Sequence, residues 1–97
     1  MIIATDMPEV SRCAAIECAY NTDSACHARA ITIGDGPDDP DCDTFFSNTH
    51  HTKRQRSAGV GACKVTGCNH NVDFECSANE IELGYNGDSV NCLTYAH

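Results

Sequence analysis

The chain has 97 residues, a net charge of −8 and eight cysteines, but only three phenylalanines, three tyrosines and no tryptophan. So few large apolar side chains exclude a large hydrophobic core, and a chain this small leaves little room for a substrate pocket. The negative charge disfavours binding to nucleic acid, because acidic surfaces repel phosphate groups.

Residues 1–11 form a lead-in that we interpret as a short strand or a tail. They contain no basic leader and no apolar run of signal-peptide length. This favours a cytoplasmic protein with reduced thiols. An extracellular or coat-associated location is the alternative if the cysteines are oxidised. No stretch of the chain approaches the length of an apolar membrane span, so we expect no membrane partner.

The eight cysteines fall into two sets of four with the same spacing. Successive cysteines within a set are 5, 8 and 16 positions apart, and the second set lies 50 positions after the first. Internal similarity of this kind indicates a tandem repeat. It defines repeat one at residues 12–46, a basic linker at 47–61 and repeat two at 62–96. The aligned repeats are identical at 11 of 35 positions.

Each repeat carries an Asn-x-Asp segment between its second and third cysteines, which is typical of a turn. A turn centred on Thr22 would place Cys18 opposite Cys26. The same turn in repeat two, centred on Val72, would place the second cysteine opposite the third again. Directly opposed strand residues are close enough to serve as two ligands of one metal.

After the third cysteine, short strands are predicted at 31–33 and 81–83, each ended by a glycine. Loops are predicted at 34–41 and 84–91. The fourth cysteine then begins a return strand with the pattern Cys-x-Thr-aromatic. No segment shows a convincing helical periodicity.

The predicted fold class is small, cysteine-stapled and mostly β or irregular, with two tandem repeat modules of about 35 residues related by pseudo-twofold packing. A module this short buries too little apolar surface to fold alone, so it needs a metal, disulfides or a partner. We expect the modules to pack together, because the strands at 31–33 and 81–83 would each leave one apolar face half covered.

The pattern Cys-x4-Cys, aromatic-Asn-x-Asp, Cys and Cys-x-Thr-aromatic resembles the uncharacterised bacterial family catalogued as domain of unknown function 1540, in two tandem copies. The resemblance covers both repeats and all eight cysteines. It also includes Asn21 and Asn71, Ala28 and Ala78, Ile31 and Ile81, and Thr44 and Thr94. The resemblance implies a shared cysteine framework, and it implies no particular reaction or substrate.

The cysteines are the candidate site. Zn²⁺ prefers four soft donors in a tetrahedron, which gives the hypothesis of two zinc ions, one Cys₄ site per repeat. The alternative is two disulfides per repeat, with three possible connectivities and no cofactor. Four thiolates also hold iron–sulfur clusters, but the usual Cys-x2-Cys runs are missing. The candidate metal ligands are Cys13, Cys18, Cys26, Cys42, Cys63, Cys68, Cys76 and Cys92.

No catalytic motif is present, so we expect a protein that is not an enzyme. The predicted function is a metal-binding structural or interaction module, with a protein partner or self-association. The alternative is a disulfide-stabilised structural or self-assembling coat-type protein. We interpret His27 as an exposed neighbour of a structural cysteine and His70 as a packing element. The linker, which includes His51, Lys53 and Arg56, is interpreted as a solvated tether.

Overall fold

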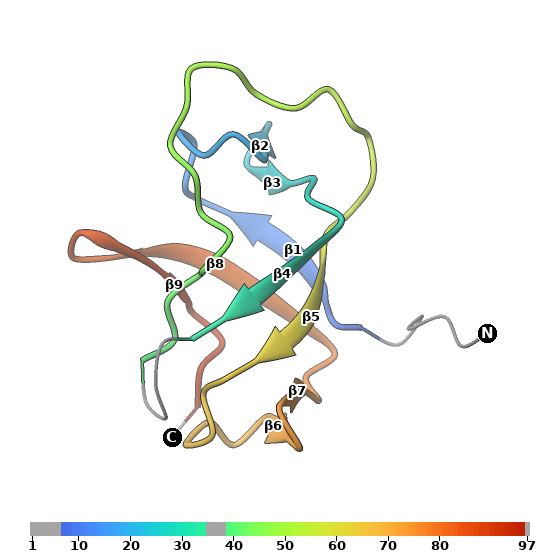
Figure 1. The fold of residues 1–97 in the computed structure, drawn as a ribbon, viewed down its shortest axis with the longest axis vertical. Helices are drawn as coiled ribbons and strands as arrows, with labels where there is room; N and C mark the ends of the chain where they lie inside the picture. Colours follow the sequence, from blue (N-terminus) through green and yellow to red (C-terminus); the bar gives the residue numbers. More distant parts are fainter. Residues whose placement is uncertain (1–6, 35–38, 97) are drawn as a thin grey trace.

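The computed structural model describes residues 7–34 and 39–96, and these residues form nine β-strands and no helix (Figure 1). The described part of the chain therefore holds no helix of the length and apolarity that crossing a membrane requires. The strands are β1 (Glu9–Cys13), β2 (Asn21–Thr22), β3 (Ala25–Cys26), β4 (Ala30–Ile33), β5 (Gly59–Cys63), β6 (Asn71–Val72), β7 (Glu75–Cys76), β8 (Glu80–Asn86) and β9 (Ser89–Cys92).

Five strands form one sheet in the order β4-β5-β1-β8-β9, which interleaves the two repeats. Strand β4 of repeat one pairs in parallel with β5, and β8 of repeat two pairs in parallel with β1. The repeats thus share a sheet, which is a closer relation than the packing of two separate modules. Strands β1 and β5 begin before the cysteine repeats, in the lead-in and in the linker.

A pseudo-twofold axis passes between β1 and β5 and relates the two repeats. The amide of Val10 donates to the carbonyl of Ala58 at 2.9 Å, and the amide of Val60 donates to the carbonyl of Pro8 at 3.0 Å. These two hydrogen bonds are the same contact seen from either repeat, because their members lie 50 positions apart. The prediction of a small, mostly β and irregular pair of repeats related by a pseudo-twofold is confirmed.

A bulge in each first strand turns its cysteine into the core. The pairing of β1 with β8 shifts by one residue between Val10 and Arg12, and β5 has the same shift after Val60. In a regular strand, residues three positions apart point to opposite faces. The extra residue of the bulge lets Val10 and Cys13 both face the core, where each is 3% exposed.

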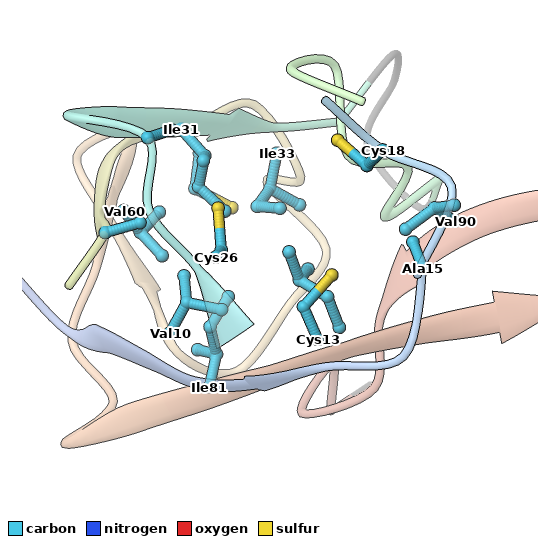
Figure 2. Packing of buried hydrophobic residues seen from close by; sticks show 14 of the residues in the cluster. Val10, Cys13, Ala15, Cys18, Cys26, Ile31, Ile33, Val60, Ile81 and Val90 are labelled. Atoms are coloured by element: carbon cyan, nitrogen blue, oxygen red, sulfur yellow. The ribbon is translucent and has the colours of Figure 1, made fainter. Parts of the chain in front are cut away.

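The core contains apolar side chains from both repeats. Figure 2 shows Val10 and Ile31 of the first half close to Val60 and Ile81 of the second, with Cys26 among them. Because the sheet interleaves the repeats, the apolar side chains of β4 and β8 are buried partly by residues of the other repeat. Pooling two small sets of apolar residues gives a larger core than one repeat offers.

The hairpin of strands β2 and β3 differs from its predicted register. Asn21, rather than Cys18, lies opposite Cys26, and β6 and β7 pair in the same way. The turn residues are Asp23 and Ser24, with φ angles of 58° and 62°. Two positive φ angles are typical of the tight type I′ turn. The turn is therefore centred between Asp23 and Ser24, rather than on Thr22 as predicted.

The prediction of a loop at 84–91 is wrong, because β8 continues through Tyr85 and forms a hairpin with β9. Gly87 begins its two-residue turn with a φ of 66°. Repeat one has prolines at 37 and 40, where repeat two has Gly87 and Val90. Proline lacks the amide that a strand ladder needs, and Pro40 stands at the position where Val90 pairs with Tyr85 in repeat two. Residues 35–38 of the loop predicted at 34–41 lie outside the described residues.

Replacing Gly34 with alanine should loosen the contact between the repeats. Gly34 follows β4 with a φ of +109°, and an added Cβ would lie 2.7 Å from Cγ2 of Val65 in repeat two. We expect Gly34→Ala to lower the free energy of unfolding by about 2–4 kcal/mol, from backbone strain and overpacking. Urea denaturation measures this loss.

The matched control is Gly87→Ala. Gly87 also has a positive φ, of +66°, but an added Cβ would meet nothing within 4 Å. Backbone strain alone should cost roughly 1 kcal/mol there. Equal losses in the two variants would show that the contact between Gly34 and Val65 does not hold the repeats together.

Candidate functional site

Each repeat places its own four cysteines around one small cavity. We call Cys13, Cys18, Cys26 and Cys42 the first quartet, and Cys63, Cys68, Cys76 and Cys92 the second quartet. Each quartet lines a cavity of about 10 Å³. A space of this size holds about one water-sized particle. The structure thus brings together the cysteines that the spacing grouped, and each of these two cavities is lined by the cysteines of one quartet only.

The members of a quartet come from four separate segments. In the first quartet, Cys13 ends β1 and Cys26 ends β3. Cys18 lies in the turn after β1, where its amide donates to the carbonyl of Ala15 at 3.0 Å. Cys42 forms an isolated bridge with Ile33 at the end of β4. The tight bend between the first two cysteines and the short hairpin that follows are what bring these segments together.

One asparagine in each repeat makes the same hydrogen bond beside its quartet. The side-chain amide of Asn21 donates to the carbonyl of Cys13 at 2.9 Å, and that of Asn71 donates to the carbonyl of Cys63 at 3.0 Å. Each asparagine thereby ties its hairpin to the end of the first strand. This contact explains in physical terms why asparagine stands at the same position of both repeats.

Each cavity is closed by residues of the other repeat. Leu83 and Val90 of repeat two line the first cavity, and Ile33 and Pro40 of repeat one line the second. This follows from the strand exchange, because Leu83 lies beside Cys13 in the parallel pair of β1 and β8. The two sites are therefore not independent modules.

Backbone amides point at sulfur atoms in both quartets. The amide of Phe46 donates to Sγ of Cys18, and the amide of His70 donates to Sγ of Cys68, each at 3.5 Å. Hydrogen bonds of this kind favour the ionised form of a thiol and stabilise the negative charge of metal-bound sulfur.

Burial dominates the acidity of the cysteines. It raises the pKa of the Cys42 thiol from 9.0 to about 11; the backbone amides of Thr44 and Phe45 oppose the shift, and the nearby thiols of Cys26 and Cys13 add to it. The thiol of Cys42 therefore stays protonated at neutral pH when no cation is bound.

The second quartet has the same acidity pattern. Burial raises the pKa of Cys92 to about 11, opposed by the backbone amides of Thr94 and Tyr95, and the thiols of Cys76 and Cys68 raise it further. A divalent cation would reverse this balance, because it stabilises thiolate over thiol and releases protons on binding.

Each quartet offers zinc a set of four sulfur donors. All eight cysteines are free thiols. Among the described residues, no group of three or more histidine, cysteine, aspartate or glutamate side chains is arranged so that it could hold a metal ion. The chemistry fits zinc in three respects, namely four soft donors, amides directed at sulfur and space for one ion. Coordination would require the four sulfurs of a quartet to turn toward a common centre.

The two histidines next to the quartets occupy different environments. His27 is half-buried rather than exposed, with Nδ1 2.8 Å from the carbonyl oxygen of Arg56 and Nε2 3.2 Å from that of Thr22. His70 lines the second cavity, at the position where Tyr20 lines the first. Among the described residues that line the two cavities, His70 is the one ligand-type side chain besides cysteine.

A search against protein families matches the family described as Domain of Unknown Function (DUF1540) at residues 12–45 and again at 62–95. The chain belongs to this family. Its two DUF1540 copies coincide with the two cysteine repeats, and each copy contains one complete quartet. Searches of the curated proteins and of the solved structures found no match. The function of the DUF1540 quartets is therefore argued from their chemistry.

The reduced, metal-free protein should lose stability in alkaline solution. The folded-state pKa values of Cys42 and Cys92, about 11, lie above the ordinary value of 9.0, so the folded state holds these protons more tightly than the unfolded state. This stabilisation is complete below pH 9 and disappears as the pH rises toward 11. The melting temperature of chelator-treated, reduced protein should fall across that range.

Lysine and tyrosine also titrate in this range, so a control is needed. The double variant Cys42→Ser, Cys92→Ser should show a shallower decline in melting temperature, because serine does not ionise there. A decline of the same steepness in both proteins would contradict the assigned role of the two thiols.

Proposed function

We propose that this chain is a non-enzymatic, zinc-binding structural module that acts through contact with another protein or with itself. Each quartet would hold one Zn²⁺ through its four thiolates. The observation that carries the proposal is the pair of pseudo-equivalent cavities, each lined by the four cysteines of one repeat.

Zinc suits this site better than ions that prefer oxygen ligands, because thiolate is a soft donor and Zn²⁺ accepts four of them tetrahedrally. When bound, the ion supplies no redox chemistry and serves to fix its ligands in place. Structural zinc contributes about 10–16 kcal/mol of apparent binding free energy, which is coupled to folding. A fold whose buried side chains are mostly alanine, valine, isoleucine and cysteine benefits strongly from such a contribution.

Backbone amides near the sulfurs would offset part of the negative charge of an occupied site. One Zn²⁺ with four thiolates carries two negative charges. The amides of Phe46 and His70 each donate to a quartet sulfur. Those of Thr44 and Thr94 oppose the rise in pKa that burial causes at Cys42 and Cys92. Such donors offset part of the charge and orient the sulfurs.

An interaction role is supported by exposed apolar side chains. Phe74 lies in the turn between β6 and β7, is 62% exposed and has a φ of 69°. A bulky residue at positive φ is strained, and turns of this type favour glycine, asparagine and aspartate. The turn itself therefore does not explain an aromatic ring at this position. An exposed ring on a fixed turn is suited to anchor a protein contact.

Zinc content measured by native mass spectrometry tests the metal proposal. The reduced protein should bind two zinc ions, and Cys26→Ser should bind one, because it removes a ligand from the first quartet only. The control His70→Ala should still bind two, since sulfur supplies all four ligands. Uptake of no zinc by the reduced parent would refute the proposal. A parent mass lowered by four disulfides, with resistance to chelator, would support the oxidised alternative.

Replacing Phe74 with asparagine tests whether the ring serves a contact rather than the fold. Asparagine tolerates the left-handed conformation, and the ring is largely exposed, so Phe74→Asn should raise the free energy of unfolding by roughly 0.5–1 kcal/mol. Thermal unfolding measures the change. A clear loss of stability would mean that Phe74 is needed for packing, which would remove the argument for an interaction surface there.

A further inference from the structure

The two quartets differ in their exposure to solvent. Cys18 and Cys26 of the first quartet are 6% and 5% exposed. Their counterparts in the second quartet, Cys68 and Cys76, are half-buried. The pseudo-twofold makes the strands equivalent, so this difference must come from something outside the shared sheet.

The linker covers the hairpin of the first repeat. It arches around β2 and β3 (Figure 1), and the amide of Thr52 donates to the carbonyl of Ala19 at 2.8 Å. The hydroxyl of Thr22 donates to the carbonyl of Thr52 at 3.2 Å. The linker is thus attached to repeat one over several residues and folds back on it, while residues 53–57 stay exposed.

Two histidines add to this attachment. Nδ1 of His51 lies 2.7 Å from the carbonyl oxygen of Asn21, which is the residue opposite Cys26 in the hairpin. His27, which follows Cys26, faces the carbonyl of Arg56 in the linker. The linker therefore closes the side of the first quartet on which Cys26 lies.

The second quartet has no such cover within the described residues. A surface groove of about 550 Å³ runs beside β6 and β7 instead, and Cys76 lines both this groove and the second cavity. Other residues of the groove are Met7, Val72, Glu75, Ser77, Ala78 and Asn79. The groove gives a solvent-borne molecule a route to a sulfur of the second quartet.

We infer that the second quartet is an exchangeable metal site, which gives up its ion to an external thiolate or chelating acceptor, whereas the first quartet releases its ion much more slowly. This inference rests on the proposed zinc function. In the exchange, Zn²⁺ passes from four protein sulfurs to the acceptor, no electron moves, and each freed thiolate takes up a proton from water. One chain would thus combine a structural site with a donor site.

Competition with a chelator tests the inference on the zinc-loaded protein. EDTA should remove the two ions in two phases of equal amplitude. The fast phase should be roughly tenfold faster, because opening the first site requires breaking several additional hydrogen bonds. Alkylation with N-ethylmaleimide after the fast phase, followed by peptide mapping, should label Cys68 and Cys76 and leave Cys18 and Cys26 unlabelled.

A linker variant and a matched control identify the cause. His51→Ala removes the contact with Asn21 and should speed the slow phase about fivefold, which corresponds to one hydrogen bond. Lys53→Ala changes an exposed residue of the same linker and should leave both phases unchanged.

The outcomes separate the two claims. Zinc uptake followed by release in a single phase, or earlier labelling of the first quartet, would overturn the inference and leave the proposed function standing. Failure of the reduced protein to bind any zinc would refute the proposed function itself. In that case, equal alkylation rates of Cys26 and Cys76 in the metal-free protein would refute the difference in access as well.

Discussion

Strands β1 and β8 belong to different repeats and pair in parallel with Cys13 beside Leu83, while β5 and β4 pair in the same way with Cys63 beside Ile33. This exchange of strands decides where each quartet lies and what closes it. A single repeat has only a few buried apolar residues, which are too few for a core. By placing its apolar strand against the other repeat, each half supplies a wall for the other half's sulfurs. The strand pairs that stabilise the sheet therefore also determine the shape of the two cavities.

The residues that recur between the repeats mark contacts that recur. Thr44 accepts a hydrogen bond from the amide of Thr32 at 3.2 Å, and Thr94 accepts one from the amide of Glu82 at 3.0 Å. Each threonine thereby fixes the segment carrying the fourth cysteine to the strand before it. Positions that differ, such as the linker-facing Thr22 and its counterpart Val72, lie where the surroundings of the two repeats differ. Residues that make the same contact in both repeats are thus identical, whereas residues that face the linker in repeat one only can differ.

The cysteine spacing was sufficient to predict two repeats and the grouping of the cysteines, because four sulfurs at fixed offsets constrain a short chain strongly. The mostly β fold class was predicted from the Asn-x-Asp turns and from the absence of helical periodicity. The alternation around Ile31 and Ile81 also located the central strands. The exchange of strands could not be predicted, because the same apolar pattern fits pairing within a repeat or between repeats. The bulge that turns Cys13 inward depends on pairing with β8, and the hairpin register depends on two positive φ angles. Neither leaves a distinct pattern in one sequence.

Peptide mapping of disulfides formed by mild oxidation of the metal-free monomer tests the central claim most directly, since only sulfurs that approach one another can be joined. Limited oxidation should produce disulfides within the first quartet and within the second quartet only. A major product joining a cysteine of one quartet to a cysteine of the other, such as Cys13 to Cys63, would contradict the account.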